Sequence, residues 1–393
     1  MEDFLRTAKK ILCVILLIVF CTYTVACEKN ESESFIDSES ESIIDENFKS
    51  LIFKDGANEK YINWYGRNKY DSTNSDMIIY NSAAGFEVDF KGTMLGMRYK
   101  EELIGKANLT GEGYIGIFTD GANDASKSFN VLKSTENITQ FNVCENLENG
   151  QHSIKVLKCT EAAAAVISVY EIYTDGYFIE PKGKPVRKIE IYGDSISAGR
   201  AARKAAGGNE NNSTSQENAL LTYASYSALN LNAQTSLFCM SGSCSGVYSN
   251  LTDSNPVVKN FEKYSPVSEE IWDFSKYIPD VVVIDLGTND ILGASSQADF
   301  EIEFERQYKA FVSKIRDKYP ETYIILCYGT YSGSVDFTAY SQVYKNIAES
   351  FADGKVFCLQ FNPCSLSHPS YIENKVYGSI LSEKIKTIIG WND

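Results

Sequence analysis

The spacing of apolar residues changes near Pro185, and this change constrains the fold more than any other feature of the 393-residue chain. Before it, short runs such as residues 85–90 and 152–157 alternate apolar with polar residues, and Gly, Asn and Asp lie between the runs. Alternation with a period of two, bounded by turn residues, is typical of half-buried antiparallel strands. We therefore expect an antiparallel β-sandwich over residues 49–182.

After Pro185, runs typical of strands alternate with runs typical of helices. The candidate strands are residues 189–192, 236–240, 281–286, 323–328 and 356–359. Apolar residues recur at helical spacing between 304 and 315 and again between 372 and 388. This alternation predicts an α/β domain, with a parallel sheet covered on both faces, over residues 183–393. The polar stretch 200–217 interrupts the pattern and is predicted to be an exposed loop.

The N-terminus has the features of an export signal. Basic residues precede an unbroken apolar run at 11–20, and small residues precede Cys27. This pattern predicts a secretory signal over residues 1–26. It also resembles a bacterial lipobox, although Thr24 stands where leucine is usual. The resemblance implies cleavage before Cys27 and attachment of a lipid to its thiol, with an uncleaved membrane anchor as the alternative.

The segment that follows, residues 27–48, is rich in Glu, Ser and Asp and has few apolar residues. Such a composition cannot bury enough apolar surface to fold, so we expect a tether. Together with the signal, it predicts a secreted protein that is lipid-anchored to the outer face of the bacterial cell membrane.

Charge and cysteine content exclude some functions. The chain has 37 Lys and Arg against 52 Asp and Glu, a balance that argues against a nucleic-acid partner. Seven cysteines follow Cys27, and an odd number cannot all pair. No Cys/His spacing is typical of zinc, and we expect neither a metal nor a cofactor. Nothing in the sequence specifies an oligomeric state.

Polar residues follow the first three candidate strands of the α/β domain. A Gly-Asp-Ser tripeptide ends at Ser195, a Ser-Gly pair ends at Gly242, and Gly-Thr-Asn-Asp contains Asn289. Because the carboxyl ends of parallel strands share one edge of the sheet, we expect these residues to converge. The chain has two histidines, and His152 lies in the sandwich pattern. His368 is therefore predicted to be the base that activates Ser195.

Ester cleavage builds an oxyanion, which needs fixed hydrogen-bond donors. The backbone N–H groups of Ser195 and Gly242 and the side-chain amide of Asn289 are suitable, with Gly246 as a rival to Gly242. Two further alternatives stay open. Cys244 lies in a Gly-x-Cys-x-Gly pattern that could present a thiol nucleophile, and Trp272 is either a core residue or a platform for a sugar ring.

These residues resemble the four sequence blocks of SGNH hydrolases. With residues 81–86, 150–152 and 272–274, they resemble carbohydrate esterase family 2, and the likeness covers about residues 60–390. The resemblance implies a jelly-roll-like β-sandwich followed by an SGNH, flavodoxin-like α/β domain. It implies removal of O-acetyl groups, including those on a primary 6-hydroxyl, from xylan- or mannan-type saccharides, through an acyl-enzyme and without a cofactor.

Carried over residue by residue, the resemblance makes Ser195 the nucleophile, His368 the base, and Gly242 and Asn289 oxyanion donors. One departure concerns Ser365, which stands where SGNH enzymes usually have an Asp that orients the histidine. We predict that a backbone carbonyl near residues 365–366 accepts the second imidazole N–H, with a carboxylate from elsewhere, such as Asp290, as the alternative. A non-catalytic carbohydrate-binding surface lipoprotein and an SGNH acyltransferase are the competing functions.

Overall fold

The computed structural model describes residues 49–53, 58–134, 136–205, 208–246, 256–294, 297–331, 336–365 and 367–391. The predicted signal, the predicted tether and Cys27 therefore lie outside the described residues. None of the described helices is long and apolar enough to cross a membrane.

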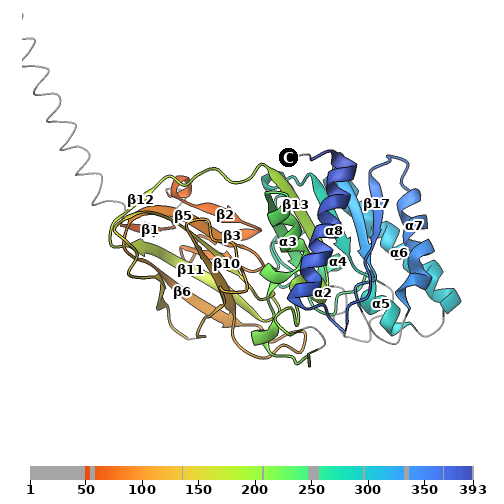
Figure 1. The fold of residues 1–393 in the computed structure, drawn as a ribbon, viewed down its shortest axis with the longest axis horizontal. Helices are drawn as coiled ribbons and strands as arrows, with labels where there is room; N and C mark the ends of the chain where they lie inside the picture. The colour runs from red at the N-terminus through yellow and green to blue at the C-terminus, as the bar shows by residue number, and fades with distance from the viewer. Residues whose placement is uncertain are drawn as a thin grey trace, which may run out of the picture. The chain divides into compact units, whose positions relative to one another are not determined.

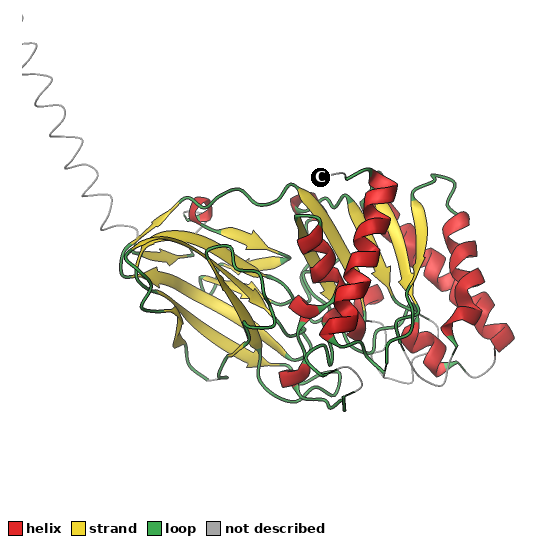
Figure 2. Ribbon diagram, viewed as in Figure 1, coloured by secondary structure: helices red, strands yellow, loops and turns green. Residues whose placement is uncertain are grey.

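The first part of the described chain is built from two antiparallel sheets, as Figure 2 shows. One sheet contains β1 (Ser50–Ile52), β3 (Asn68–Asp71), β4 (Asp76–Ile79), β6 (Leu95–Leu103), β9 (Thr139–Cys144) and β11 (Ala165–Thr174). The other contains β2 (Asn63–Tyr65), β5 (Gly85–Gly92), β7 (Tyr114–Thr119), β8 (Asn130–Val131), β10 (Gly150–Lys158) and β12 (Tyr177–Ile179). The predicted antiparallel architecture is confirmed.

Period-two alternation explains why these strands form a sandwich. Phe86, Val88 and Phe90 are fully buried alternate residues of β5 and belong to one apolar core with Ile167 and Val169 of β11. Successive side chains of a strand point to opposite faces, so each sheet places one apolar row against the other sheet.

The second part is a parallel sheet in the order β14-β13-β15-β16-β17. Its strands are β13 (Arg187–Gly193), β14 (Ala233–Cys239), β15 (Val281–Asp285), β16 (Tyr323–Tyr328) and β17 (Val356–Gln360). Both faces are buried, which is why these strands are almost continuously apolar. The order is that of a flavodoxin-like sheet and agrees with the predicted α/β domain.

Helices cover both faces of this sheet. Ile189 and Ile191 of β13 share a core with α3 (Tyr223–Asn230) and α8 (Tyr371–Ile389), while Tyr192 shares a core with α6 (Gln297–Lys318) and α7 (Ser341–Glu349). Figure 1 shows α8 beside α3, and α6 beside α7. The short helices α2 (Ser195–Ala198), α4 (Pro256–Asn260) and α5 (Thr288–Gly293) complete the described set.

A buried arginine joins the sandwich to the parallel sheet. Arg67, which is 1% exposed, donates from Nη2 to Glu190 Oε1 of β13 at 2.9 Å. Its Nη1 donates to the carbonyl oxygens of Phe261 and Lys263, at 2.7 Å each. Because such contacts run between the two parts, the described residues from Leu51 onward form one packed unit.

Candidate active site

The strand order of the parallel sheet reverses beside β13, because β14 lies on one side of it and β15 on the other. Ligands bind outside the carboxyl ends of strands at such a point. The loops after β13, β14 and β15 bring Ser195, Gly242 and Asn289 to one cavity of about 520 Å³, and His368 reaches it from the loop before α8. The structure therefore brings together the four residues singled out by their positions in the sequence.

Ser195 is the first residue of α2, immediately after β13. Asp194 caps this short helix by accepting a hydrogen bond from Ile196 N at 2.9 Å, as Asp does at helix starts. The Ser195 N–H has no intrahelical partner at this position. Ser195 Oγ lies 2.7 Å from His368 Nε2, so the serine and the histidine are within direct hydrogen-bond distance.

The other nitrogen of the imidazole faces a carboxylate. Glu210 Oε1 lies 2.9 Å from His368 Nδ1, and Glu210 Oε2 accepts a hydrogen bond from Ser367 Oγ at 2.7 Å. Two cations flank the carboxylate, with Arg200 Nε at 3.6 Å and Lys204 Nζ at 3.7 Å. Ser195, His368 and Glu210 therefore form a continuous hydrogen-bonded row.

The charge of Glu210 decides which imidazole nitrogen carries the proton. Burial opposes ionisation, but the hydrogen bonds from His368 and Ser367, with the positive charge of Lys204, lower the pKa of the Glu210 carboxyl to about 2. An ionised carboxylate can only accept hydrogen bonds. His368 Nδ1 therefore carries the proton, and Nε2 is left to accept the proton of the Ser195 hydroxyl.

A carboxylate, rather than the predicted backbone carbonyl near residues 365–366, faces the second imidazole nitrogen in the described structure, and residue 366 itself lies outside the described residues. His368 Nδ1 lies within hydrogen-bond distance of Glu210 and of Ser367 Oγ instead. Asp290, the alternative carboxylate, accepts hydrogen bonds from Ser245 and Gly246.

The stretch 200–217 is only in part the exposed loop that its composition predicted, because residues 209, 211, 212 and 215 are exposed whereas 201, 202, 204, 214 and 217 are buried. Thr110 N donates to Asn212 O at 2.9 Å, and Thr214 N donates to Thr110 O at 3.0 Å, so the sandwich holds this segment. Glu210 is thereby placed beside His368. No local motif marks Glu210, and the only sequence signal was an isolated acid in a Gly- and Asn-rich segment.

The glycine loop after β14 begins with a turn. Ser243 N donates to Met240 O at 3.2 Å, and Gly242 has a φ of +82° that favours glycine. None of the described residues accepts a hydrogen bond from the Gly242 N–H, which is therefore free to bind an oxyanion. Gly246, the rival donor, instead donates its N–H to Asp290 Oδ1 at 3.2 Å.

Asn289 lies beside this loop, at the start of α5. Its Nδ2 donates to Asp194 Oδ2 at 3.1 Å and to Ser243 O at 2.9 Å. Both amide hydrogens therefore already have partners, and binding an oxyanion requires the amide to share or release one of these bonds.

Two alternatives from the sequence do not fit the structure. Cys244 is 2% exposed, and burial raises the pKa of its thiol, which disfavours the nucleophilic thiolate. Trp272 is 5% exposed and packs edge-on against Tyr264 and near Arg67, so it cannot serve as a surface platform for a sugar. Neither residue lines the cavity that contains Ser195.

The cavity walls come from both parts of the chain. Residues 105–108 of the sandwich line it, together with Arg200, Leu292 and Tyr331 of the α/β part. The Tyr331 ring meets the His368 ring edge-on, with centroids 5.9 Å apart. Within the described ranges, no group of three or more His, Cys, Asp or Glu side chains is placed to hold a metal ion.

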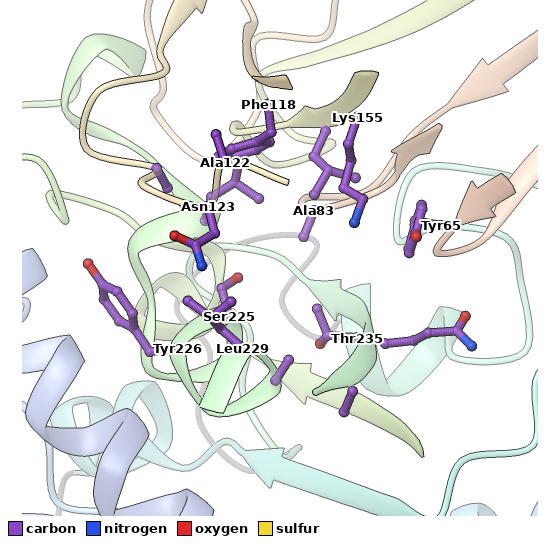
Figure 3. A pocket seen from close by; sticks show the side chains of 16 residues that line it. Tyr65, Ala83, Phe118, Ala122, Asn123, Lys155, Ser225, Tyr226, Leu229 and Thr235 are labelled. Carbon is purple, nitrogen blue, oxygen red and sulfur yellow. The ribbon is translucent and has the colours of Figure 1, made fainter. Parts of the chain in front are cut away.

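A second cavity, of about 170 Å³, contains none of these residues. Figure 3 shows that its walls come from the sandwich, including Tyr65, Phe118 and Lys155, and from α3 and β14, including Leu229 and Thr235. Its lining residues include no histidine, whereas the first cavity has both Ser195 and His368 in its walls.

Comparison with known families accounts for both parts of the chain. Residues 64–181 match the family described as carbohydrate esterase 2 N-terminal, and residues 191–365 match the GDSL-like lipase/acylhydrolase family. In both of its parts the chain is therefore similar to a family 2 carbohydrate esterase. The residues around Ser195 and most of the α/β part fall within the GDSL-like match.

Individual relatives agree with this likeness. The cellulase/esterase CelE of Acetivibrio thermocellus is 30% identical over 79% of this chain, which spans only 37% of CelE. An acetylxylan esterase/glucomannan deacetylase of Cellvibrio japonicus is 23% identical over 72% of this chain and 78% of its own length. These names, with the GDSL-like domain, support a carboxylic ester hydrolase.

A solved structure is similar along most of the described chain. The family two carbohydrate esterase from Clostridium thermocellum, in complex with cellohexaose, is 26% identical, with a TM-score of 0.73. The match covers 84% of this chain and all of that one.

Proposed function

We propose that this chain is a family 2 carbohydrate esterase, which removes O-acetyl groups from carbohydrate through an acyl-enzyme. The observation that carries the proposal is the row in which Ser195 Oγ lies 2.7 Å from His368 Nε2 while Glu210 holds the opposite nitrogen. A nucleophile, a base and a group that orients the base are the parts that acyl transfer from an ester requires.

In the first half-reaction, Ser195 Oγ bonds to the acetyl carbonyl carbon as its proton passes to His368 Nε2. The carbonyl oxygen becomes an oxyanion, which the N–H groups of Ser195 and Gly242 stabilise. The Asn289 amide joins them by releasing its longer hydrogen bond, to Asp194. Collapse of this intermediate breaks the ester bond, and the sugar oxygen leaves with the proton from His368.

In the second half-reaction, water gives its proton to His368 and attacks the acetyl-Ser195 ester. Collapse of the second oxyanion returns the proton to Ser195 Oγ and releases acetate. In both halves Glu210 keeps the imidazole in one tautomer and stabilises the imidazolium that forms.

The names of the relatives support the proposed substrate class. One is named an acetylxylan esterase/glucomannan deacetylase, and a solved relative binds cellohexaose. We propose acetylated xylan- or mannan-type saccharides, including those acetylated on the 6-hydroxyl, as substrates of this chain.

Acetate release tests this function. The protein should release acetate from acetylated xylan, acetylated glucomannan or 6-O-acetyl sugars and hydrolyse 4-nitrophenyl acetate, and Ser195→Ala should do neither. If the wild type binds these polysaccharides without releasing acetate, the chain is a carbohydrate-binding protein rather than an esterase. Transfer of acetyl to a sugar acceptor faster than to water would indicate an acyltransferase.

We also propose that the mature protein is a lipoprotein anchored through Cys27 to the outer face of the cell membrane. The support is the sequence alone, in which Thr-Val-Ala precedes Cys27 after an apolar run. Cells fed a fatty-acid analogue should label the wild type and not Cys27→Ser. Equal labelling of the two proteins would contradict the anchor.

A further inference from the structure

Hydrogen bonds hold the glycine loop, residues 240–246, at several positions. Asn289 donates to Ser243 O at 2.9 Å, and Asp290 accepts from Ser245 N at 2.7 Å. Both residues lie on α5, within the α/β part. The second residue of the loop, Ser241, is held by the sandwich part of the chain.

Glu161 makes that contact from the connection between β10 and β11 of the sandwich. Its side chain is fully buried, and its Oε2 accepts a hydrogen bond from Ser241 N at 2.7 Å. Its Oε1 accepts a second hydrogen bond, from Ser241 Oγ. One carboxylate thus binds both donors of a single residue, 80 positions away in the sequence.

Buried neighbours hold Glu161 in place. Its backbone N–H donates to Glu217 Oε1, and its carbonyl oxygen accepts from Lys158 Nζ at 3.1 Å. Burial raises the pKa of Glu161 and lowers the pKa of Lys158 to about 8, while Lys158 and Arg200 favour the charged carboxylate. A buried carboxylate is costly unless hydrogen bonds and opposite charge compensate it, and here Ser241 donates two hydrogen bonds while the charges of Arg200 and Lys158 are favourable.

The geometry of the turn links Ser241 to the oxyanion donor. Ser241 and Gly242 are the two central residues of the turn closed by Ser243 N and Met240 O. A φ of +82° at Gly242 is that of a type II turn. The Gly242 N–H belongs to the peptide group that joins Ser241 to Gly242. Type I and type II turns differ by a flip of this peptide group, which reverses the direction of its N–H. Clamping Ser241 therefore sets the direction in which the Gly242 N–H points.

We propose that Glu161 is a positioning residue that aims the Gly242 N–H at the oxyanion. The inference rests on the proposed function, and it gives the sandwich a part in catalysis. The sandwich supplies the carboxylate that orders the oxyanion loop, in addition to a wall of the cavity. The family 2 N-terminal domain and the hydrolase domain then form one catalytic unit.

Kinetics of Glu161 variants test this role. Glu161→Leu removes both hydrogen-bond acceptors and keeps a similar side-chain volume. It should lower kcat on 4-nitrophenyl acetate at least about tenfold and leave KM within about twofold of the wild type. This loss is smaller than that caused by removing an oxyanion donor altogether, because the Gly242 N–H remains and only its direction is less well fixed. Glu161→Gln should stay within about threefold of the wild type, because its oxygen can accept from Ser241 N and its amide can donate to Ser241 Oγ. A fluorophosphonate also builds negative charge in the oxyanion hole when it reacts with Ser195. Its reaction rate should therefore be similar for the wild type and Glu161→Gln and lower for Glu161→Leu.

Glu101→Leu is the matched control. Glu101 is another buried carboxylate of the sandwich, on β6, and it accepts from Gly113 N rather than from the glycine loop. Its replacement should lower the unfolding midpoint while leaving kcat unchanged below that temperature. If Glu161→Leu does not fold, Ser241→Ala replaces it, since it removes only the hydroxyl bond to Glu161, and kcat should fall severalfold at constant KM.

An unchanged kcat in folded Glu161→Leu or in Ser241→Ala overturns the proposal, as does an equal loss in Glu101→Leu. Absence of activity and of fluorophosphonate labelling in the wild type would instead refute the proposed function. The two failures are therefore distinguishable.

Discussion

At the scale of single residues, the site depends on a carboxylate that replaces the acid missing at Ser365. Glu210 reaches His368 from a segment before α3, and it is ionised because its hydrogen bonds and nearby cations outweigh burial. A charged partner both fixes the tautomer and stabilises the imidazolium, whereas a backbone carbonyl could do mainly the first.

Glu210→Gln should therefore lower kcat on 4-nitrophenyl acetate at least about a hundredfold with little change in KM, since loss of the carboxylate in a serine protease costs about ten-thousandfold. Ser365→Ala should change kcat less than about twofold, because the Ser365 N–H that binds Glu373 remains. A larger loss in Ser365→Ala than in Glu210→Gln would show that the orienting group has been misassigned.

The lowered pKa of Glu210 also affects stability. Its folded pKa of about 2 lies below the ordinary value of 4.5, so its ionised form stabilises the fold above pH 4.5, and this contribution is lost as the pH falls towards 2. The difference in unfolding free energy between wild type and Glu210→Gln, measured in urea, should shrink over that interval. A difference that is constant from pH 6 to pH 3 would contradict the shift.

At the scale of elements, the active site is a set of loops held together at the ends of parallel strands. The start of α5 joins two of them, because Asn289 donates to Asp194 in the loop after β13 and to Ser243 in the loop after β14. One side chain thus joins the two loops and, in the proposed mechanism, also binds the oxyanion.

Asn289→Ala should lower kcat by about a hundredfold or more, because it removes a donor that strengthens its bond in the transition state. We expect KM to rise only modestly, since the substrate cavity keeps its other walls. Steady-state kinetics with 4-nitrophenyl acetate measure both constants, and an intact kcat would place the oxyanion site elsewhere.

At the scale of the whole molecule, buried polar contacts join the sandwich to the hydrolase sheet. Arg67 supplies one set, to Glu190 and to the carbonyls of Phe261 and Lys263. Glu161 supplies another, at the oxyanion loop. Such contacts explain why the described residues from Leu51 onward pack as one unit although their two halves have different architectures.

Arg67→Ala should destabilise the protein by about 3–5 kcal/mol, because it leaves Glu190 buried without its cation. Arg98→Ala is the control, since the Arg98–Glu171 pair lies on the surface and should contribute less than about 1 kcal/mol. Urea unfolding measures the free energy of unfolding of both variants. Similar losses in the two would mean that the buried pair contributes no more to stability than the surface pair.

The sequence by itself determined the fold class and four residues that line the cavity of the proposed active site. Periodicity is a local property, so period two before Pro185 and alternating strands and helices after it predicted the sandwich and the parallel sheet. The sequence indicated Ser195, Gly242 and Asn289 because each lies in the loop that follows a strand of one parallel sheet. The carboxyl ends of parallel strands share one edge of the sheet, so these loops meet there. His368 followed from the presence of only two histidines.

Only the tertiary structure decided what surrounds these residues. Glu210 meets His368, and Glu161 meets Ser241, through long-range packing of the sandwich against the hydrolase part, which no local pattern encodes. Trp272 is buried for the same reason, because the side chains that cover it, Tyr264 and Arg67, become its neighbours only in the fold. A sequence motif identifies the residues that react. The residues that orient them can be identified only from distances and burial, and these are defined only in the folded chain.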